Sequence, residues 1–210
     1  LGGTAFLLSF MVGIPLGILS AVWRGSFGDY IGRFLALLGQ AVPSFWLGLV
    51  LIMLFAVHWR LFPAALRGDG IWDVKHLVLP TITLAAGGFA FYMRITRAAM
   101  LEVLDSEYVR LARAKGVSNN RVIWKHAFKN AVIQPLTGAT LGVVGLLNGT
   151  VLVETIFAWP GMGLMAITAV NNNDFPLLQG AVFFFTILIV ATTFVTDLLY
   201  AYIDPRIRYD

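Results

Sequence analysis

The sequence predicts an all-α integral membrane protein, and three observations carry that prediction. Hydrophobic residues make up 59% of the 210 residues and charged residues only 12%. A soluble domain carries roughly 25% charged residues. The mean hydropathy is +0.81, and long uncharged runs lie on either side of a single long charged stretch, residues 105–131.

Five apolar runs are long enough to cross the hydrocarbon of a bilayer, which takes roughly 20 helical residues. We expect spans at residues 1–23, 34–57, 77–99, 132–154 and 177–202. Gly13-Ile14-Pro15-Leu16-Gly17 is expected to kink the first helix, and Pro43 lies inside the second. The third is expected to continue helically through Arg94 and Arg97 towards the charged stretch. Glycines in the fourth allow close helix packing.

The distribution of basic residues predicts the orientation of these spans. Twelve of the 15 Lys and Arg residues fall on one side: Arg24, Arg33, the 94–129 block, Arg206 and Arg208. The other side keeps only Arg60, Arg67 and Lys75. The basic side is expected to be the cytoplasm. The chain opens at Leu1 without a methionine, and five spans would place Leu1 outside, so we expect the full chain to have a sixth, N-terminal span.

Residues 155–173 form a further uncharged segment that could be taken for a span. A full crossing there would turn the basic C-terminal tail outward. Trp159-Pro160-Gly161-Met162-Gly163 and the run of three asparagines at 171–173 argue against a crossing. We expect a partly inserted outer loop with a short helix over residues 162–170, because non-helical backbone is tolerated at that depth only where protein or water covers it.

The pattern of residues 105–131 indicates two short helices joined by a tight turn. Asp105 and Ser106 can cap the first helix and Ser118 the second, and Gly116 is expected to end the first in a left-handed conformation. On the first helix one face carries Tyr108, Leu111, Ala112 and Lys115. Two interpretations stand: a solvated or headgroup-bound segment, or a rigid docking element. The small residues around Ala112 favour docking, because they let a partner approach the backbone closely.

These residues resemble a known family. The segment is similar to the cytoplasmic "EAA" loop of permease subunits of ATP-binding cassette importers, with the pattern E-A-A-x3-G-x9-I-x-L-P. Ala112 and Gly116 match it, whereas Arg110, Leu111 and His126 depart from it. The departures match the dipeptide/oligopeptide branch, which reads E-Y-[VI]-R-x-A-[RK]-A-K-G and then H-x-x-[RK]-N-[AS]. The segments that fit this branch are 107–116, 126–131, 154–161 and 197–208.

The resemblance implies a type I importer permease fold and a pore-forming subunit, most like those for di- or oligopeptides, in the plasma (inner) membrane of a prokaryote. It implies a second homologous permease subunit, two ATP-binding subunits and an extracytoplasmic substrate-binding protein. The chain itself would bind no cofactor, and ATP and Mg would sit in the partner ATPases. Uptake of nickel complexes or glutathione stays open, because the permeases for these substrates share the motifs.

Roles for particular residues follow from the resemblance and, for Glu154 and Asp197, from their positions as the acids nearest the membrane interior. The residues expected to dock the ATPase are Glu107, Arg110, Ala112, Arg113, Ala114, Lys115, Gly116, Val117 and Ser118. Those expected at an outer gate are Glu154, Trp159, Pro160 and Gly161, and Asp197 is expected to fix packing near the inner mouth. The alternative for Glu154 and Asp197 is an ordinary hydrogen-bonding role within the helix bundle or at the interface.

Several other functions find no support in the sequence. It contains no cysteine, no Walker A sequence and no G-x-S-x-G, and His58, His76 and His126 lack metal-ligand spacing. A metal site, ATP binding by the chain itself and catalysis are therefore not expected. The net charge of +4 does not indicate nucleic-acid binding, because the basic residues gather on one side of the membrane. A secondary transporter or channel would show repeats and several intramembrane charges, and an intramembrane enzyme would show a polar catalytic set.

Overall fold

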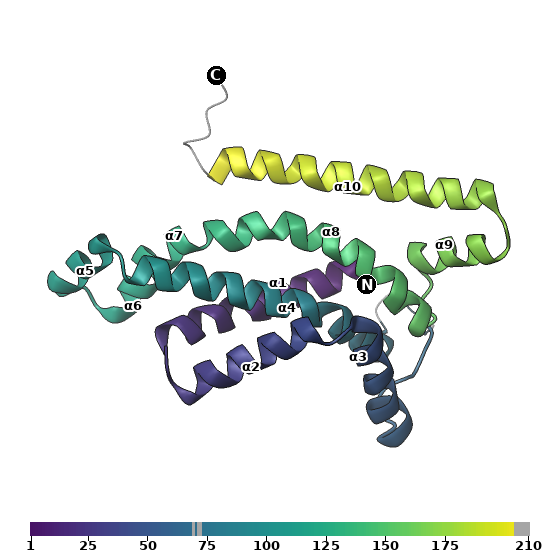
Figure 1. The fold of residues 1–210 in the computed structure, drawn as a ribbon, viewed down its shortest axis with the longest axis horizontal. Coiled ribbons are helices and arrows are strands. Elements are labelled where there is room, and N and C mark those ends of the chain that lie inside the picture. Colours follow the sequence, from purple (N-terminus) through teal and green to yellow (C-terminus); the bar gives the residue numbers. More distant parts are fainter. Residues whose placement is uncertain (69, 71–72, 204–210) are drawn as a thin grey trace. The chain divides into compact units, whose positions relative to one another are not determined.

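A computed structural model of the chain describes residues 1–68, 70 and 73–203, except for the side chains of residues 140, 141, 143–149, 196, 197 and 199–203. All regular secondary structure in this described part is helical (Figure 1). The elements are α1 (Gly2–Val22), α2 (Phe27–Ala41), α3 (Ser44–Leu51), the π-helical segment η1 (Ile52–His58), α4 (Val74–Leu104), α5 (Glu107–Ala114), α6 (Asn119–Arg121), the π-helical segment η2 (Val122–Phe128), α7 (Lys129–Ala131), α8 (Ile133–Ile156), α9 (Met162–Asn171) and α10 (Phe175–Ile203).

The chain divides into two compact units. The first consists of Leu1–Leu8, Val42–Ala86 and Thr140–Asp210, and the second of Ser9–Ala41 and Gly87–Ala139. Helices α1, α4 and α8 each contribute residues to both units. The candidate outer loop belongs to the first unit and the charged segment 105–131 to the second.

The first unit has an apolar core of large and small side chains. Its buried members are Ala5, Leu79, Leu84, Ala85, Val153, Phe157 and Trp159. Gly48 on α3 lies against this core, because a β-carbon there would stand 3.2 Å from the Phe157 ring and 3.3 Å from the Thr83 methyl group. In lipid, helices associate through such close packing rather than through the hydrophobic effect, so a small residue at the contact is favourable.

In the second unit, α1 packs closely against α4 through two glycines. A β-carbon at Gly13 would stand 2.9 Å from the Phe89 carbonyl oxygen, and one at Gly17 would stand 2.7 Å from the Met93 carbonyl oxygen. The spacing of four residues places both glycines on one side of α1, as in small-xxx-small helix contacts. Helix α1 runs without interruption from Gly2 to Val22 with Pro15 inside it. The segment Gly13–Gly17, in which we expected a kink, supplies the two glycines that contact α4.

The expected second span, residues 34–57, is interrupted. Helix α2 ends at Ala41 and α3 begins at Ser44 after Pro43, whose backbone is extended (φ −60°, ψ 136°). Proline has no N–H for an intrahelical hydrogen bond, and its ring clashes with the preceding turn. Helix α2 also begins at Phe27, seven residues before the expected start. Its first two turns carry Asp29 and Arg33, charges that a search for uncharged runs excludes.

Helices occupy all five expected ranges. In the described part of the chain, Gly2–Val22, Val74–Leu104 and Phe175–Val195 are long and apolar enough to cross a membrane, and α2 with α3 and η1 would add a fourth candidate if the two pieces form one crossing. Helix α8 has 24 residues, but many of its side chains lie outside the described part. The number of crossings stays a prediction.

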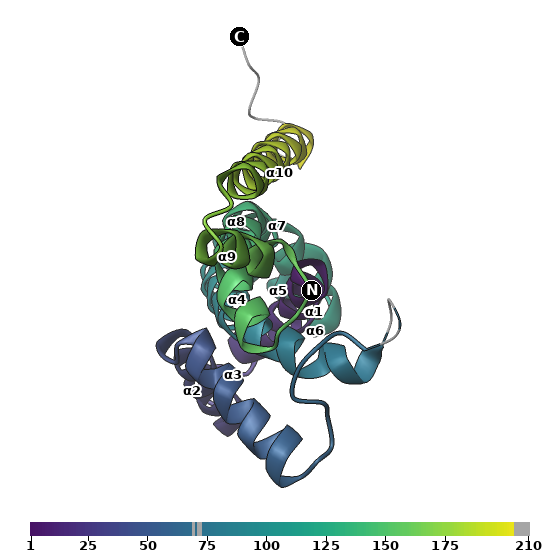
Figure 2. The ribbon, with the colours of Figure 1, turned by 90° about the vertical axis from the view of Figure 1, so that its right-hand side faces the viewer.

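The segment 155–173 contains one short helix, as expected. Helix α9 has ten residues, which at 1.5 Å per residue is about 15 Å, or half the hydrocarbon thickness. The chain then turns at residues 172–174 into α10, which contacts α9 (Figures 1 and 2). Only 6% of the most apolar 18-residue window of α10, within Phe175–Val195, is buried.

Candidate functional site

The charged segment 105–131 folds as a helical hairpin at the C-terminal end of α4 (Figure 1). Helix α5 packs against η2. Each contributes buried apolar residues to the contact: Val109 and Ala112 from α5, and Val122, Ile123 and Ala127 from η2. The two helices therefore form one packed unit rather than a solvated loop, and the remaining faces are free to meet another protein.

A Schellman motif ends α5, with Gly116 at the position that the sequence predicted. Gly116 has φ +76°, a left-handed conformation in which glycine is favoured. Its N–H donates to the Arg113 carbonyl at 2.9 Å, and the Val117 N–H donates to the Ala112 carbonyl at 3.2 Å. No atom lies within 4 Å of where a β-carbon would be. The requirement for glycine thus comes from the backbone and not from crowding.

The residues expected to cap the two helices occupy the N-cap positions, but their side chains do not make the capping hydrogen bonds. Ser106 and Ser118 occupy the N-cap positions of α5 and α6, yet neither side chain bonds the first turn of its helix. The Ser106 hydroxyl instead donates to the Val103 carbonyl at 2.5 Å. Ser106 therefore ties the hairpin back to the end of α4.

An asparagine connects the two arms of the hairpin. The Asn130 side-chain amide donates to the Tyr108 hydroxyl at 3.0 Å and to the His126 carbonyl at 3.0 Å. Tyr108 and Asn130 are 22 residues apart in sequence and belong to the two motif fragments singled out above. This hydrogen bond links the two motif fragments in space. It gives a structural reason for both fragments to occur in the same segment.

One expected docking residue lies on the inside of the hairpin. Ala112 is only 8% exposed, so a partner cannot contact it directly. Tyr108 and Leu111, on the face that we expected to share with Ala112, are exposed instead. The other expected docking residues are exposed or, for Val117, half-buried: Glu107, Arg110, Arg113, Ala114, Lys115, Gly116, Val117 and Ser118. The ion pair of Arg110 with Glu107 (3.2 Å) is on the surface and contributes little to stability.

In the candidate outer loop, Glu154 is buried and caps α9. Its carboxylate accepts hydrogen bonds from the backbone N–H groups of Gly163 at 2.7 Å and Leu164 at 3.1 Å. These N–H groups lie in the first turn of α9 and have no partner within the helix, and the helix dipole favours a negative charge there. Glu154 thus neutralises the cost of its own burial with two charge-assisted hydrogen bonds.

The two glycines of the loop make room for that carboxylate. A β-carbon at Gly161 would fall within 2.3 Å of the Glu154 carboxyl group, and one at Gly163 would come within 2.6 Å of the Val151 α-carbon. Trp159 is buried in the core of the first unit, and its backbone N–H donates to the Glu154 backbone carbonyl at 2.8 Å. Pro160 is exposed between them. The residues expected at an outer gate therefore form one rigid corner between α8 and α9. The Asp197 side chain lies outside the described residues.

A third cluster, centred on Asp29, was not found from the sequence. Asp29 is 1% exposed. Its carboxylate accepts two hydrogen bonds from Arg97 (2.9 and 3.1 Å), one from the Ser20 hydroxyl (2.5 Å) and one from the Gly25 N–H (3.0 Å). Arg33 lies 3.4 Å away as a second cation. This network connects α1, the turn after α1, and α2 to α4. The several hydrogen bonds and the ion pairs offset the cost of burying the Asp29 charge.

The signal for this cluster was present but faint. Asp29 lies four residues before Arg33, on the side of the chain where basic residues gather. Pairing removes the cost that normally excludes such charges from a membrane helix. If Asp29 and Arg33, four residues apart, are counted as a neutral pair, the second apolar run extends back to include both residues.

Comparison with known proteins agrees with this architecture. The fold is similar to that in a structure of the MetNI methionine ABC transporter in an inward-facing conformation, with a TM-score of 0.75 at 16% identity over 97% of this chain and 91% of that chain. The predicted fold class, an all-helical importer permease, is confirmed. The molecule is a membrane transport protein.

The family follows from the sequence comparisons. Residues 13–209 match the family of binding-protein-dependent transport system inner membrane components, and this chain belongs to that family. It is 40% identical to the dipeptide transport system permease protein DppB of Escherichia coli strain K12, covering 100% of this chain and 70% of the relative. It is 39% identical to the oligopeptide transport system permease protein AppB of Bacillus subtilis strain 168, covering 97% and 66%. The resemblance inferred from the hairpin motifs is confirmed.

Proposed function

We propose that this chain is a pore-forming membrane subunit of an ATP-driven importer of dipeptides or oligopeptides. The observation that carries the proposal is the identity of 40% over the whole chain with the dipeptide permease of Escherichia coli. Relatives named as permeases for dipeptides, for di- and tripeptides and for oligopeptides match at 39–40%. Among the described residues, no group of three or more His, Cys, Asp or Glu side chains could hold a metal ion. We assign ATP hydrolysis to partner subunits.

The proposed assembly follows the family description, which names a binding-protein-dependent system. A second permease subunit would complete the pore, two ATPases would lie in the cytoplasm with their ATP and Mg, and a substrate-binding protein would deliver the peptide from outside. The chain would form a single transmembrane domain in the inner membrane of a prokaryote. The nearly unburied apolar surface of α10 supports contact with lipid or a second membrane subunit.

The hairpin 105–131 is the proposed coupling element, with the exposed residues around Gly116 as the docking surface for an ATPase. Motion of the ATPase would press on α5. The contact of α5 with η2, the bond between Asn130 and Tyr108 and the hydroxyl of Ser106 would carry that displacement into the hairpin as a whole and to the end of α4. Rigidity supports this role, because a solvated loop would absorb the push without transmitting it.

Transport by the reconstituted complex tests the substrate assignment. The two permease subunits and the two ATPases are assembled in proteoliposomes with the cognate binding protein, and ATP-dependent uptake of a labelled dipeptide is measured. Unlabelled tripeptide should compete, whereas glutathione and a nickel chelate should not. Uptake of glutathione or the nickel complex in place of the dipeptide would keep the family and overturn the substrate.

Gly116→Val tests the coupling role. A β-branched residue at φ +76° is strained by about 1–2 kcal/mol, which should disturb the turn and displace the docking surface. We expect assembly of the membrane subunits to be retained and both peptide uptake and peptide-stimulated ATP hydrolysis to fall severalfold.

The matched control is Gly116→Asn, because asparagine adopts the left-handed conformation more readily than other residues with a β-carbon. The space around the β-carbon is open, so the asparagine variant should stay near wild-type activity. Lys125→Ala, an exposed change on η2, should also have a small effect. Wild-type uptake by Gly116→Val would exclude the hairpin turn as the coupling element.

A further inference from the structure

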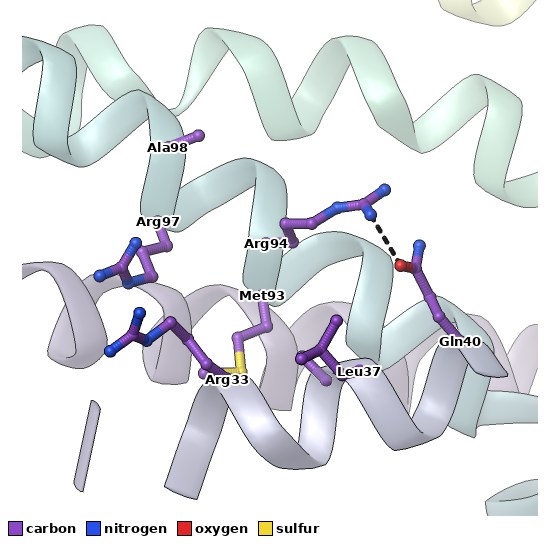
Figure 3. A pocket seen from close by; sticks show the side chains of 8 residues that line it. Arg33, Leu37, Gln40, Met93, Arg94, Arg97 and Ala98 are labelled. Atoms are coloured by element: carbon purple, nitrogen blue, oxygen red, sulfur yellow. Dashed lines mark hydrogen bonds between the residues drawn. The ribbon is translucent and has the colours of Figure 1, made fainter. Parts of the chain in front are cut away.

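A groove in the second unit lies between α2 and α4 (Figure 3). It has a volume of about 220 Å³, less than the roughly 300–1,000 Å³ of pockets that hold drug-sized molecules. From α2 it is lined by Arg33, Ala36, Leu37 and Gln40, and from α4 by Met93, Arg94, Arg97 and Ala98. None of the lining residues is acidic, and three of the eight are arginines.

The positive charge at the groove exceeds what its neighbourhood neutralises. Asp29 accepts two hydrogen bonds from Arg97 and lies 3.4 Å from Arg33, so one carboxylate serves two guanidinium groups. Arg94 donates at 2.7 Å to the neutral side chain of Gln40, and this contact is exposed. The dashed line in Figure 3 marks it. Three cations and one anion leave a surplus of positive charge beside the groove.

The wall between the arginines is apolar. Ala36, Leu37, Met93 and Ala98 provide it together with the methylene stems of the arginines. The surface of α2 next to the groove continues this character, since Phe34, Leu37 and Leu38 are all exposed. A small free anion would gain nothing from such a wall. A molecule with an anionic head and a hydrocarbon tail would use both parts.

The place of the groove along α4 adds a third argument. Arg94 and Arg97 directly follow the apolar stretch of α4 on the side that the basic residues predict to be cytoplasmic. That is the level of the phospholipid headgroups, where basic pockets between membrane helices bind anionic lipids. The volume is suited to a phosphoglycerol head and excludes a whole lipid, so the acyl chains would lie outside along α2.

We propose that this groove binds an anionic phospholipid, with its phosphate at Arg94 and Arg33 and one acyl chain along the exposed apolar surface of α2. Arg97 already donates two hydrogen bonds to Asp29. It therefore attracts the phosphate mainly through the long-range electrostatic field of its charge. Because Arg94 takes no part in the Asp29 network, its charge can be removed without disturbing that network, and a glutamine at this position keeps an amide donor for Gln40.

The test uses the complete importer complex in nanodiscs of phosphatidylcholine with a defined fraction of phosphatidylglycerol. Lipids retained after mild detergent extraction are counted by native mass spectrometry. We expect wild type to retain phosphatidylglycerol at least fivefold over its share in the nanodisc. Arg94→Gln should reduce that retention by about fivefold, the effect of one basic residue near an anionic surface, and leave phosphatidylcholine unchanged. Arg121→Gln, which removes an exposed charge of α6 away from the groove, should have no effect.

A second variant separates a lipid from a free anion. Ala98→Trp fills the apolar wall and keeps all three arginines, so it should reduce phosphatidylglycerol retention as Arg94→Gln does, and added inorganic phosphate should not displace the lipid from wild type. Retention unchanged by Ala98→Trp together with displacement by inorganic phosphate would identify a simple anion site and overturn the proposal. Equal retention of the two lipids, or retention insensitive to Arg94→Gln, would overturn it as well.

Discussion

Gly116 and Gly161 both lie between two successive helices, but a side chain would be unfavourable at each for a different reason. Gly116 has a left-handed backbone and open space around it. Gly161 has an extended backbone (φ −142°) that any residue adopts, and the Glu154 carboxylate occupies the place of its side chain. The first glycine is needed for its conformation and the second for its size, so the two positions should respond differently to substitution.

This difference leads to a prediction for the outer loop. Gly161→Ala should lower the stability of the complex by about 1–3 kcal/mol, because the added methyl group forces the carboxylate away from the N-terminus of α9. In a Glu154→Ala background the same change should cost much less, since the obstacle is gone. Thermal unfolding of the four proteins in one double-mutant cycle measures the coupling, which for residues in contact is about 0.5–3 kcal/mol. Additive effects would mean that Glu154 does not occupy this position.

The same corner bears on uptake. If the loop of Trp159, Pro160 and Gly161 helps to form an outer gate, Gly161→Val should impair peptide uptake while the ATPases still assemble with the membrane subunits. A purification tag on an ATPase subunit checks assembly, and uptake is measured in parallel. Full uptake by this variant would leave Glu154 with a structural role alone.

At the same scale, the sequence predicted conformation better than burial. The left-handed Gly116 followed from its residue type, because few residues tolerate that conformation. Ala112 was expected at a docking surface, but a helix with Val109 and Ala112 on one side and Tyr108 and Leu111 on another offers two apolar faces. Periodicity cannot select between them. The partner that selects the buried one is η2, which begins only ten positions after Ala112.

At the scale of elements, the contact of α1 with α4 depends on backbone approach. Gly13 and Gly17 meet carbonyl oxygens of α4 at distances that no β-carbon tolerates. Backbone atoms cannot move aside as a flexible side chain can. The two glycines therefore specify where the helices cross, and substitution at either should separate α1 from α4 over the whole contact.

A pair of alanine substitutions within α1 tests this. Gly17→Ala should destabilise the protein by about 1–3 kcal/mol through overpacking. Gly3→Ala, where no atom lies within 4 Å of the added carbon, should be neutral or stabilising by up to about 1 kcal/mol through helix propensity. The shifts in the midpoint of thermal unfolding should thus have opposite signs. A loss of similar size for both variants would attribute the effect to α1 in general and not to the contact.

The extent of the elements was predictable where hydropathy alone determines them. Helices α1, α4 and α10 agree with the expected ranges, because long apolar helices are the means by which a chain satisfies its backbone in lipid. The expectation failed at α2. Its first turns carry Asp29 and Arg33, whose charges are compensated by residues far away in sequence. The break at Pro43 was visible in the sequence, but whether a proline bends a helix or ends it depends on the packing around it.

At the scale of the whole molecule, α10 leaves a long apolar surface exposed. Helix α10 is 6% buried over its apolar window, against 50% for α4. Its outward side chains include Phe183, Val190 and Phe194. Patches of this kind mark contacts with a membrane or another protein. This surface supports the proposed contact of α10 with lipid or with a second membrane subunit.

The orientation of the molecule in the membrane is the prediction on which the proposed function depends most. The excess of basic residues on the side of the hairpin, twelve against three, predicts that residues 105–131 and 204–210 face the cytoplasm and that residues 60–76 and 159–174 face outward. Only then can the hairpin meet an ATPase and the outer loop meet a binding protein. The 210 residues contain no cysteine, so single introduced cysteines can report the side.

Asn119 and Asn172 form a matched pair for this purpose, since both are exposed asparagines at helix ends. In intact cells a membrane-impermeant maleimide should label Asn172→Cys and leave Asn119→Cys unlabelled. After permeabilisation both should react, which excludes burial as the reason for protection. Labelling of Asn119→Cys from outside would place the hairpin on the wrong side for an ATPase, and the coupling role would then fail even though the helices, their packing and the family remained as described.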